Sequence, residues 1–132
     1  MGEFLSWDDK ARILYIHFED ILDDQVLLDR YHMVREWIAE HGPVSSISDF
    51  SDVASFEVTP AGVKALAGNP PLVPDDFRRM VVAPQDLAFG MTRMFEGMGS
   101  RTRSDVEVVR SLPEALHLLG LQRFEPRVLQ MW

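Results

Sequence analysis

Short runs of β-branched and aromatic residues alternate along this chain with longer segments in which apolar residues recur every three or four positions. The first two runs cover residues 3–7 and 12–18, and the turn-like sequence Asp8-Asp9-Lys10 between them predicts an opening hairpin. Both alternating faces of the second run carry apolar side chains. A strand that is covered on both faces is typical of a layered α/β sheet.

The first helical segment is predicted to begin at Asp23 or Asp24 and to end at Gly42. Helices are also predicted from Pro60 to Gly68, over residues 86–98 and over 112–119, and strands over residues 44–50, 77–83 and 105–110. The order β-β-α-β-α-β-α-β-α predicts an α/β fold, with a mixed, mostly parallel five-stranded sheet and four helices. We expect residues 1–120 to form a single domain and residues 121–132 to form a C-terminal tail, whose secondary structure the pattern leaves open.

Composition and charge narrow the classes of function. The chain has 132 residues, no cysteine and a formal net charge of −8. The absence of cysteine excludes thiolate catalysis, disulfides and sites built on metal–thiolate bonds. The negative charge disfavours nucleic acid as a partner, and no apolar run reaches the roughly 20 residues that span a membrane. Because no secretory signal pattern is present, we expect a cytoplasmic protein.

Residues capable of catalysis or metal binding are dispersed along the chain. His32 and Glu36 are four positions apart, but they lie on a polar helix face where such pairs are common. The sequence predicts no catalytic residues, no metal site and no cofactor. Asp49, Asp52 and Asp86 are expected near the C-terminal edge of the sheet, where open α/β folds bind ligands, although strand ends and helix caps favour aspartate in any case.

The first helix carries more apolar surface than packing on a sheet requires. Its expected core stripe consists of Leu27, Tyr31, Val34 and Ile38. A second apolar surface, here called the apolar shoulder, consists of Val26, Met33 and Trp37. Either a neighbouring element such as the C-terminal tail covers this shoulder, or it is a surface for a ligand, a partner protein or a second copy of the chain.

The helix over residues 86–98 is rich in methionine. One face is predicted to carry Leu87, Met91, Met94 and Met98, with Phe95 adjacent. Packing on the sheet explains this face, and an adaptable apolar binding surface is the alternative. Phe89 lies on the opposite side of the helix among polar residues, which indicates a contact beyond the core.

Three pairs of stretches, taken in order, carry a resemblance to a known family. They are residues 49–53 (Asp-Phe-Ser-Asp-Val) with 61–66 (Ala-Gly-Val-Lys-Ala-Leu), residues 81–84 (Val-Val-Ala-Pro) with 89–96 (Phe-Gly-Met-Thr-Arg-Met-Phe-Glu), and residues 106–116 (Val-Glu-Val-Val-Arg-Ser-Leu-Pro-Glu-Ala-Leu) with 118–120 (Leu-Leu-Gly). The chain resembles the SpoIIAA-like proteins of the STAS superfamily, whose fold is shared in part with the lipid-carrying SEC14 domains.

The resemblance implies a place for a regulatory switch. In phosphorylated STAS proteins, a serine at the helix start that follows the acidic strand end is modified. The matching place here keeps Gly62 but has Pro60 and Ala61 where the serines would stand, so Thr59 is the only hydroxyl at that helix start. Thr59 is either a switch residue or a helix cap. The candidate switch residues are Asp49, Ser51, Thr59 and Gly62.

The sequence therefore favours a non-enzymatic STAS-like or SpoIIAA-like binding module, regulatory through contacts with a protein partner or with a second copy as a homodimer. The alternative is a carrier or sensor of a small apolar or lipid-like ligand, as the SEC14 side of the resemblance implies. A connected cavity of several hundred Å³ lined by Met91, Met94 and Phe95 would favour the carrier. A filled core beside an exposed patch at Phe89 or Trp37 would favour the interaction module.

Overall fold

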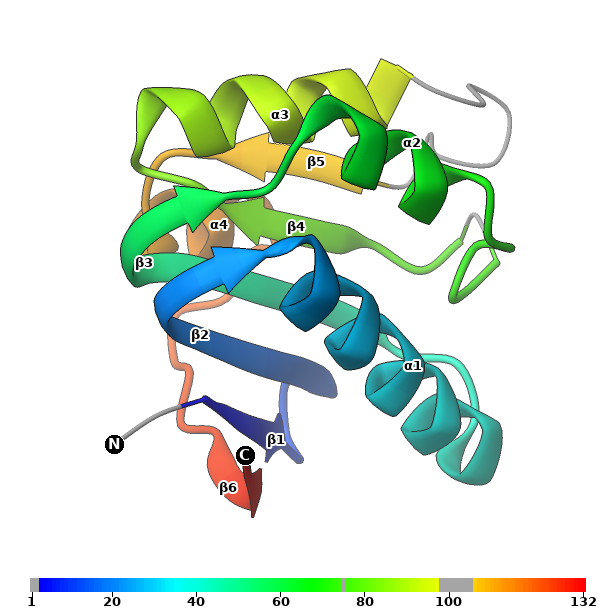
Figure 1. Cartoon of the computed structure of the whole chain (residues 1–132). Coiled ribbons are helices and arrows are strands. Elements are labelled where there is room, and N and C mark those ends of the chain that lie inside the picture. Colours follow the sequence, from blue (N-terminus) through cyan, green and yellow to red (C-terminus); the bar gives the residue numbers. More distant parts are fainter. Residues whose placement is uncertain (1–2, 75, 98–105) are drawn as a thin grey trace.

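A six-stranded sheet forms the centre of the computed structural model, which describes residues 3–74, 76–97 and 106–132 (Figure 1). The strands are β1 (Phe4–Asp8), β2 (Ile13–Asp23), β3 (Ser45–Glu57), β4 (Arg79–Val82), β5 (Val106–Val109) and β6 (Arg127–Met131). The helices are α1 (Asp24–His41), α2 (Pro60–Ala67), α3 (Asp86–Gly97) and α4 (Leu112–Leu118). The strand order is β5-β4-β3-β2-β1-β6.

β1 runs in the opposite direction to the other strands of the sheet. The pairs β2–β3, β3–β4 and β4–β5 are parallel, whereas β1 pairs antiparallel with both β2 and β6. The β1–β2 hairpin closes through the bond that the Arg12 amide donates to the Asp8 carbonyl, at 2.8 Å. β2 and β3 continue to pair beyond His17 and Asp49, where their pairing with β1 and β4 ends. The two strands therefore project as a ribbon past the rest of the sheet.

Helices cover both faces of the sheet. α1, α2 and α3 pack on one face, where Val34, Val63 and Ala88 join a core with Leu14 and Ile16 of β2. α4 packs on the opposite face, behind the sheet in Figure 1, where buried Ala115 joins a second core. The second core also contains Ile13, Tyr15, Ile47 and Met80. The prediction that both faces of the second strand are covered is confirmed.

The predicted core stripe of α1 is confirmed, because Tyr31 and Val34 are buried and Leu27 and Ile38 are packed against the core. The prediction for α3 is wrong in its rotation. Its buried residues are Ala88, Thr92 and Phe95, whereas Leu87 is 55% exposed and Met91 and Met94 are only partly buried. Met98 lies outside the described residues.

The rotation of α3 has a physical reason in its small residues. Ala88 and Thr92 let the helix axis approach the sheet more closely than methionines would, and closer packing removes more apolar surface from water. The Thr92 hydroxyl donates to the Ala88 carbonyl within the helix at 2.8 Å, which satisfies a buried polar group. A threonine on the core face therefore carries little penalty.

The C-terminal tail contains a strand that the sequence pattern left open. β6 adds to β1, so the sheet has six strands rather than the predicted five, and β1 is not the edge. The segment before β6 is held by Asp8, whose Oδ2 accepts the Glu125 amide at 2.7 Å, and by the Phe124 ring, which lies 5.5 Å from the Tyr15 ring. These contacts join the two ends of the described chain.

Candidate functional site

The C-terminal half of α1 borders an open groove on the same face of the sheet, here called the aromatic groove. Its volume is about 420 Å³, and it is lined by Leu5, Trp7, Arg12, Trp37, His41, Val44, Leu129 and Gln130. The Trp7 and Trp37 rings are 5.5 Å apart, and Trp37 stacks on His41 at 4.1 Å. The Arg12 guanidinium lies 5.2 Å from the Trp7 ring. The groove thus combines flat aromatic surfaces with a cationic rim, on which apolar and π-bearing groups bind well.

The N-terminal half of the apolar shoulder is covered by the last residue of the chain. Arg30 forms an ion pair with Glu3 at 2.5 Å, and its guanidinium lies 4.6 Å from the Trp132 ring. Trp132 and Val26 line a common shallow hollow, and Arg30 also donates to the Met33 sulfur at 3.5 Å. The tail therefore covers the shoulder near Val26. This is one of the two alternatives that the sequence left open, in which the C-terminal tail covers the shoulder.

Phe89 lies under an arginine from the end of β5. The Arg110 guanidinium is 4.0 Å from the Phe89 ring, donates to Asp86 at 2.8 Å and also reaches the Pro84 carbonyl at 3.1 Å. Phe89 is half-buried and packs against the core. The contact beyond the helix that its position indicated is thus made within the chain, and Asp86 takes part in it through Arg110.

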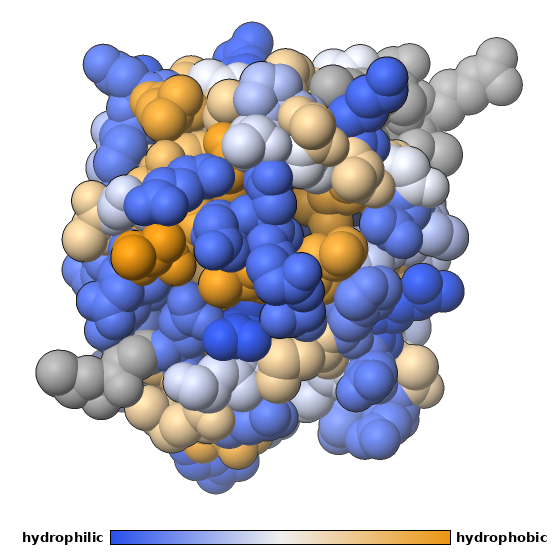
Figure 2. Space-filling model, viewed as in Figure 1, coloured by the Kyte–Doolittle hydropathy of each residue, from blue (hydrophilic) through white to orange (hydrophobic). Residues whose placement is uncertain are grey.

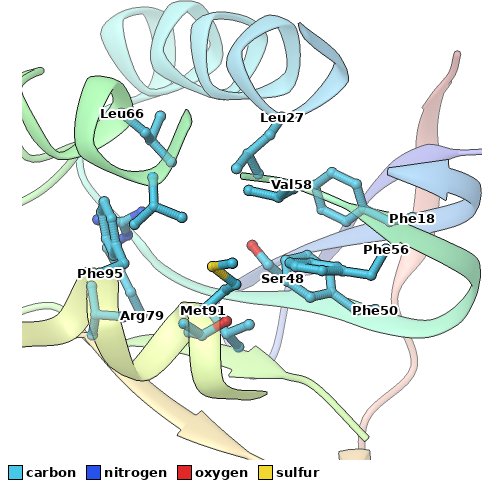
Figure 3. Close-up of a pocket in the computed structure, with 14 residues that line it drawn as sticks. Phe18, Leu27, Ser48, Phe50, Phe56, Val58, Leu66, Arg79, Met91 and Phe95 are labelled. Atoms are coloured by element: carbon cyan, nitrogen blue, oxygen red, sulfur yellow. The ribbon is translucent and has the colours of Figure 1, made fainter. Parts of the chain in front are cut away.

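An interior pocket lies between α1, α2, α3 and the sheet. Its volume is about 90 Å³, and Leu27, Leu66, Met91 and Phe95 form its walls together with aromatic residues of β2 and β3 (Figure 3). Ser48 and Arg79 bring polar groups to it from the sheet. Met94 is absent from its walls. The pocket is far smaller than the several hundred Å³ that the carrier alternative required.

The N-terminus of α2 shows how Thr59 and Gly62 are used. The Thr59 hydroxyl accepts the Gly62 amide at 3.0 Å, which makes Thr59 the N-cap, and it donates to Asp24 Oδ2 at 2.6 Å. Asp24 Oδ1 accepts the Thr59 amide at 2.8 Å. A Cβ atom at Gly62 would lie 2.0 Å from Asp24 Oδ1. The carboxylate of Asp24 thus occupies the space that glycine leaves open at this positive end of the helix.

Asp49 and Ser51 belong to a different group of bonds, on the face that α4 covers. Asp49 is buried and accepts the Tyr15 hydroxyl at 2.5 Å, the Ser51 amide at 2.9 Å and the Ser51 hydroxyl at 2.5 Å. Burial, together with this bond to Asp49, raises the pKa of Tyr15 above its usual value. The four candidate switch residues therefore divide between two hydrogen-bonded groups.

His17 links the two strands of the projecting ribbon. Its Nε2 lies 3.2 Å from Glu19 and 3.2 Å from Asp52, and its ring stacks on Phe4 at 4.6 Å. The buried Nδ1 atom has no hydrogen-bond partner among the described residues. Asp49 lies where the pairing of β3 with β4 ends, and Asp52 lies beyond it on the ribbon.

The sequence pattern did not identify several residues of these sites. Asp24, Tyr15 and Trp7 act through partners that are distant in the chain, as the 35 positions between Asp24 and Thr59 illustrate. Local patterns carry no signal for such pairs. Asp24 did appear as a possible helix cap, but Asp23 has that role through its bond from the Val26 amide at 2.9 Å.

Within residues 3–74, 76–97 and 106–132, no group of three or more His, Cys, Asp or Glu side chains is arranged to hold a metal ion. The helices in the same part of the chain are too short or too polar to cross a membrane.

Comparison with solved structures identifies the architecture. An uncharacterized protein of the DUF3478 family with a SpoIIAA-like fold, from Shewanella loihica PV-4, superposes with a TM-score of 0.52 and 12% identity, over 89% of this chain and 92% of that chain. The chain has a SpoIIAA-like fold. Bacillus SpoIIAA in its phosphorylated form gives a TM-score of 0.49 and 14% identity, over 88% of this chain and 98% of that chain. At these identities the likeness concerns the SpoIIAA-like fold alone. No protein-family model and no curated protein sequence matches the chain.

Proposed function

We propose that this chain is a non-enzymatic binding module that acts through protein–protein contacts at the aromatic groove. The observation that carries the proposal is the pair of tryptophans, Trp7 and Trp37, on the wall of an open groove of about 420 Å³. Tryptophan is among the residues most enriched at the energetic centres of protein interfaces. Trp37 belongs to the apolar shoulder, whose Val26 end is covered by Trp132, so the Trp37 end is the part that a partner would contact.

The polar groups of the molecule support a non-enzymatic role. The Asp49 carboxylate is occupied by Tyr15 and Ser51, and the Thr59 hydroxyl is occupied by Gly62 and Asp24. These bonds stabilise strands and helix ends. We therefore propose that Thr59 is a cap, since a phosphate on it would be placed beside the Asp24 carboxylate and repelled by it.

Site-specific crosslinking tests the groove. A photoreactive phenylalanine derivative at His41, inside the groove, should capture a defined protein in the host cell, whereas the same group at His117 on α4 should not. With that partner purified, Trp37→Ala should weaken binding at least about 30-fold, the usual effect of losing an interface anchor. Equal capture from both positions, or an affinity unchanged by Trp37→Ala, would refute the groove as the binding surface.

The interior pocket supports a second candidate, the binding of a small apolar ligand. Ser48, Arg79 and Thr92 provide polar groups in a wall whose other residues are apolar, which is the usual composition of a ligand site. The volume of about 90 Å³ fits a small molecule and not a lipid with long chains.

Native mass spectrometry tests this second candidate. Protein purified from its own host should carry a small bound molecule that is lost on denaturation. Met91→Trp, which fills the pocket, should abolish the bound mass, and Met94→Trp on the same helix should not. A wild-type mass equal to that of the bare chain would exclude a tightly bound ligand.

A further inference from the structure

The edge of the sheet formed by β6 is open along its length. β6 is the last strand in the sheet order, and in the described part of the chain it pairs with β1 alone. An edge strand presents backbone N–H and C=O groups that can pair with another strand. Natural proteins usually protect such an edge by making it short, by covering it or by placing charges along it.

β6 carries one charge and a β-bulge, which are two of the devices that protect an edge, but its side chains leave a large apolar surface in solvent. All five residues are exposed, and Val128, Leu129 and Met131 are 48%, 42% and 54% exposed. These three make up half of the large exposed hydrophobic residues in the described part of the chain, where the other three are Ile21, Leu87 and Leu118. Figure 2 shows orange and tan surface at the lower end of the molecule, where β6 lies in Figure 1. Arg127 is the only charged residue of the strand.

We infer that β6 docks β6 of a second copy of this chain, in an antiparallel pair related by a two-fold axis. The inference goes beyond the proposed function, because it concerns the sheet edge and not a partner in the groove. An interface on a two-fold axis must be complementary to itself. The sequence of β6 meets this requirement better than it fits a charged partner.

Complementarity follows from the positions along the strand. With the axis at Leu129, Arg127 lies opposite Met131 of the other copy and Val128 lies opposite Gln130. The two Arg127 residues stand four positions apart, or about 13 Å at the usual rise per residue. That distance exceeds the Debye length of about 8 Å at physiological salt, so their repulsion is screened. Leu129 of each copy then lies opposite Leu129 of the other copy, at the centre of the strand pair.

A β-bulge gives the middle of the strand a particular role. Gln130 pairs with Leu5 and Val128 pairs with Ser6, which leaves Leu129 without an opposite residue on β1. Leu129 and Gln130 also line the aromatic groove. A second copy paired at Leu129 therefore borders the groove.

The opposite edge of the sheet explains why such pairing ends at a dimer. β5 packs between α3 and α4, and its Val106 and Val109 side chains are buried. Because β5 offers no comparable apolar edge, each copy has one docking strand. A two-fold pair uses both docking strands, so the assembly is closed and does not grow into a fibre.

The inference is tested by mass in solution over a range of concentrations, using sedimentation equilibrium. The wild-type chain should reach twice its mass of 15.1 kDa. Leu129→Lys, which places two ammonium groups opposite each other at the axis, should shift the dissociation constant upward by at least about 30-fold. The matched control is Leu118→Lys, which replaces a leucine of similar exposure on α4 and should leave the dimer intact. Circular dichroism checks that both variants keep the native helix content.

Salt and hydrogen exchange provide two further readouts. Two copies that each carry a charge of −8 repel, so raising the salt concentration should tighten the dimer, whereas it would weaken binding of a basic partner. Amide exchange within residues 127–131 should slow as protein concentration rises. A chain that stays monomeric at all concentrations and salts overturns the inference. So does a dimer that Trp37→Ala dissociates and Leu129→Lys does not, because that result assigns self-association to the groove.

Discussion

At one edge of the sheet β5 lies between two helices, whereas at the other edge β6 is exposed along all five of its residues. Val106 and Val109 of β5 are 2% and 3% exposed, and Glu107 is held by Arg78 at 2.7 Å. On β6 the apolar residues face solvent and the strand is anchored mainly through β1 and Asp8. The same sheet thus has an edge built for stability and an edge available for contacts.

This difference predicts which substitutions should change the free energy of unfolding and which should change the affinity for other chains. The free energy of unfolding depends on buried surface and on satisfied polar groups, which are concentrated around β5 and the helices beside it. Contacts with other chains depend on exposed apolar groups and open backbone, which are found at β6 and the aromatic groove.

The largest difference is expected from placing the same charge on each edge. Val109→Asp buries a carboxylate without a partner and should lower the free energy of unfolding by about 4 kcal/mol or more. At a concentration where the chain is monomeric, Val128→Asp leaves the charge in water and should change this free energy by about 0.5 kcal/mol at most. Urea denaturation followed by tryptophan fluorescence measures both. Similar losses for the two variants would show that the edges do not differ.

The next largest effect on the free energy of unfolding is expected at Asp8, which anchors the segment before β6. Asp8 accepts the amides of Lys10, Ala11 and Glu125. Burial acts to raise the pKa of Asp8, but these three backbone donors outweigh it and hold the pKa below its usual value. Asp8→Asn should cost about 2 kcal/mol at neutral pH, as for other hydrogen bonds to a charged group.

The pH dependence of this anchor has a defined sign. Because the folded chain holds the Asp8 pKa low, the stabilisation is fully present above the unfolded pKa of about 3.9 and is lost as the pH falls through the folded value. The difference in unfolding free energy between wild type and Asp8→Asn should therefore shrink below about pH 4. A difference that stays constant down to pH 2 would contradict the role of the carboxylate charge.

A smaller effect is expected at the N-cap of α2. Thr59→Ala should cost about 1 kcal/mol, and Thr59→Ser, which keeps the hydroxyl, should cost less. Thermal or urea unfolding measures the difference. If Thr59→Ala leaves stability unchanged but abolishes partner binding, the switch interpretation of Thr59 replaces the cap.

The smallest effect is expected from the ion pair on β5. Glu107 and Arg78 are both more than a third exposed, so water screens their attraction. Glu107→Gln should therefore cost about 0.5 kcal/mol at low salt and less at 1 M salt. A loss above about 2 kcal/mol would show that the β5 edge depends on this pair rather than on its buried valines.

The elements that local chemistry specifies were predicted correctly. Thr59 caps α2 because a hydroxyl before the first turn can accept an amide bond from that turn. Gly42 ends α1 with a positive φ of 92°, which glycine adopts without strain. The candidate switch residues remain predictions, since their geometry describes contacts and not regulation.

The sequence pattern could not predict the features that depend on partners distant in the chain. The rotation of α3 follows from how closely Ala88 and Thr92 approach the sheet, which its own periodicity does not contain. β6 lacks the alternation of buried and exposed residues that identifies a strand, because all of its side chains are exposed. Asp86 is bound by Arg110, a partner 24 positions away that local patterns do not indicate.

The pairing of β1 with β6 also has a consequence for how the chain folds. Asp8 and Glu125 are 117 positions apart, so this contact closes one of the longest loops in the molecule. Closing such a loop reduces the entropy of the chain before the contacts between its ends can stabilise it. These contacts therefore tend to form after the rate-limiting step. Substitutions in β6 should then leave the refolding rate nearly unchanged and accelerate unfolding, whereas substitutions in the β2–β3 pair should slow refolding. During synthesis, the Asp8 end of β1 is therefore made 117 residues before Glu125, the residue that it binds beside β6.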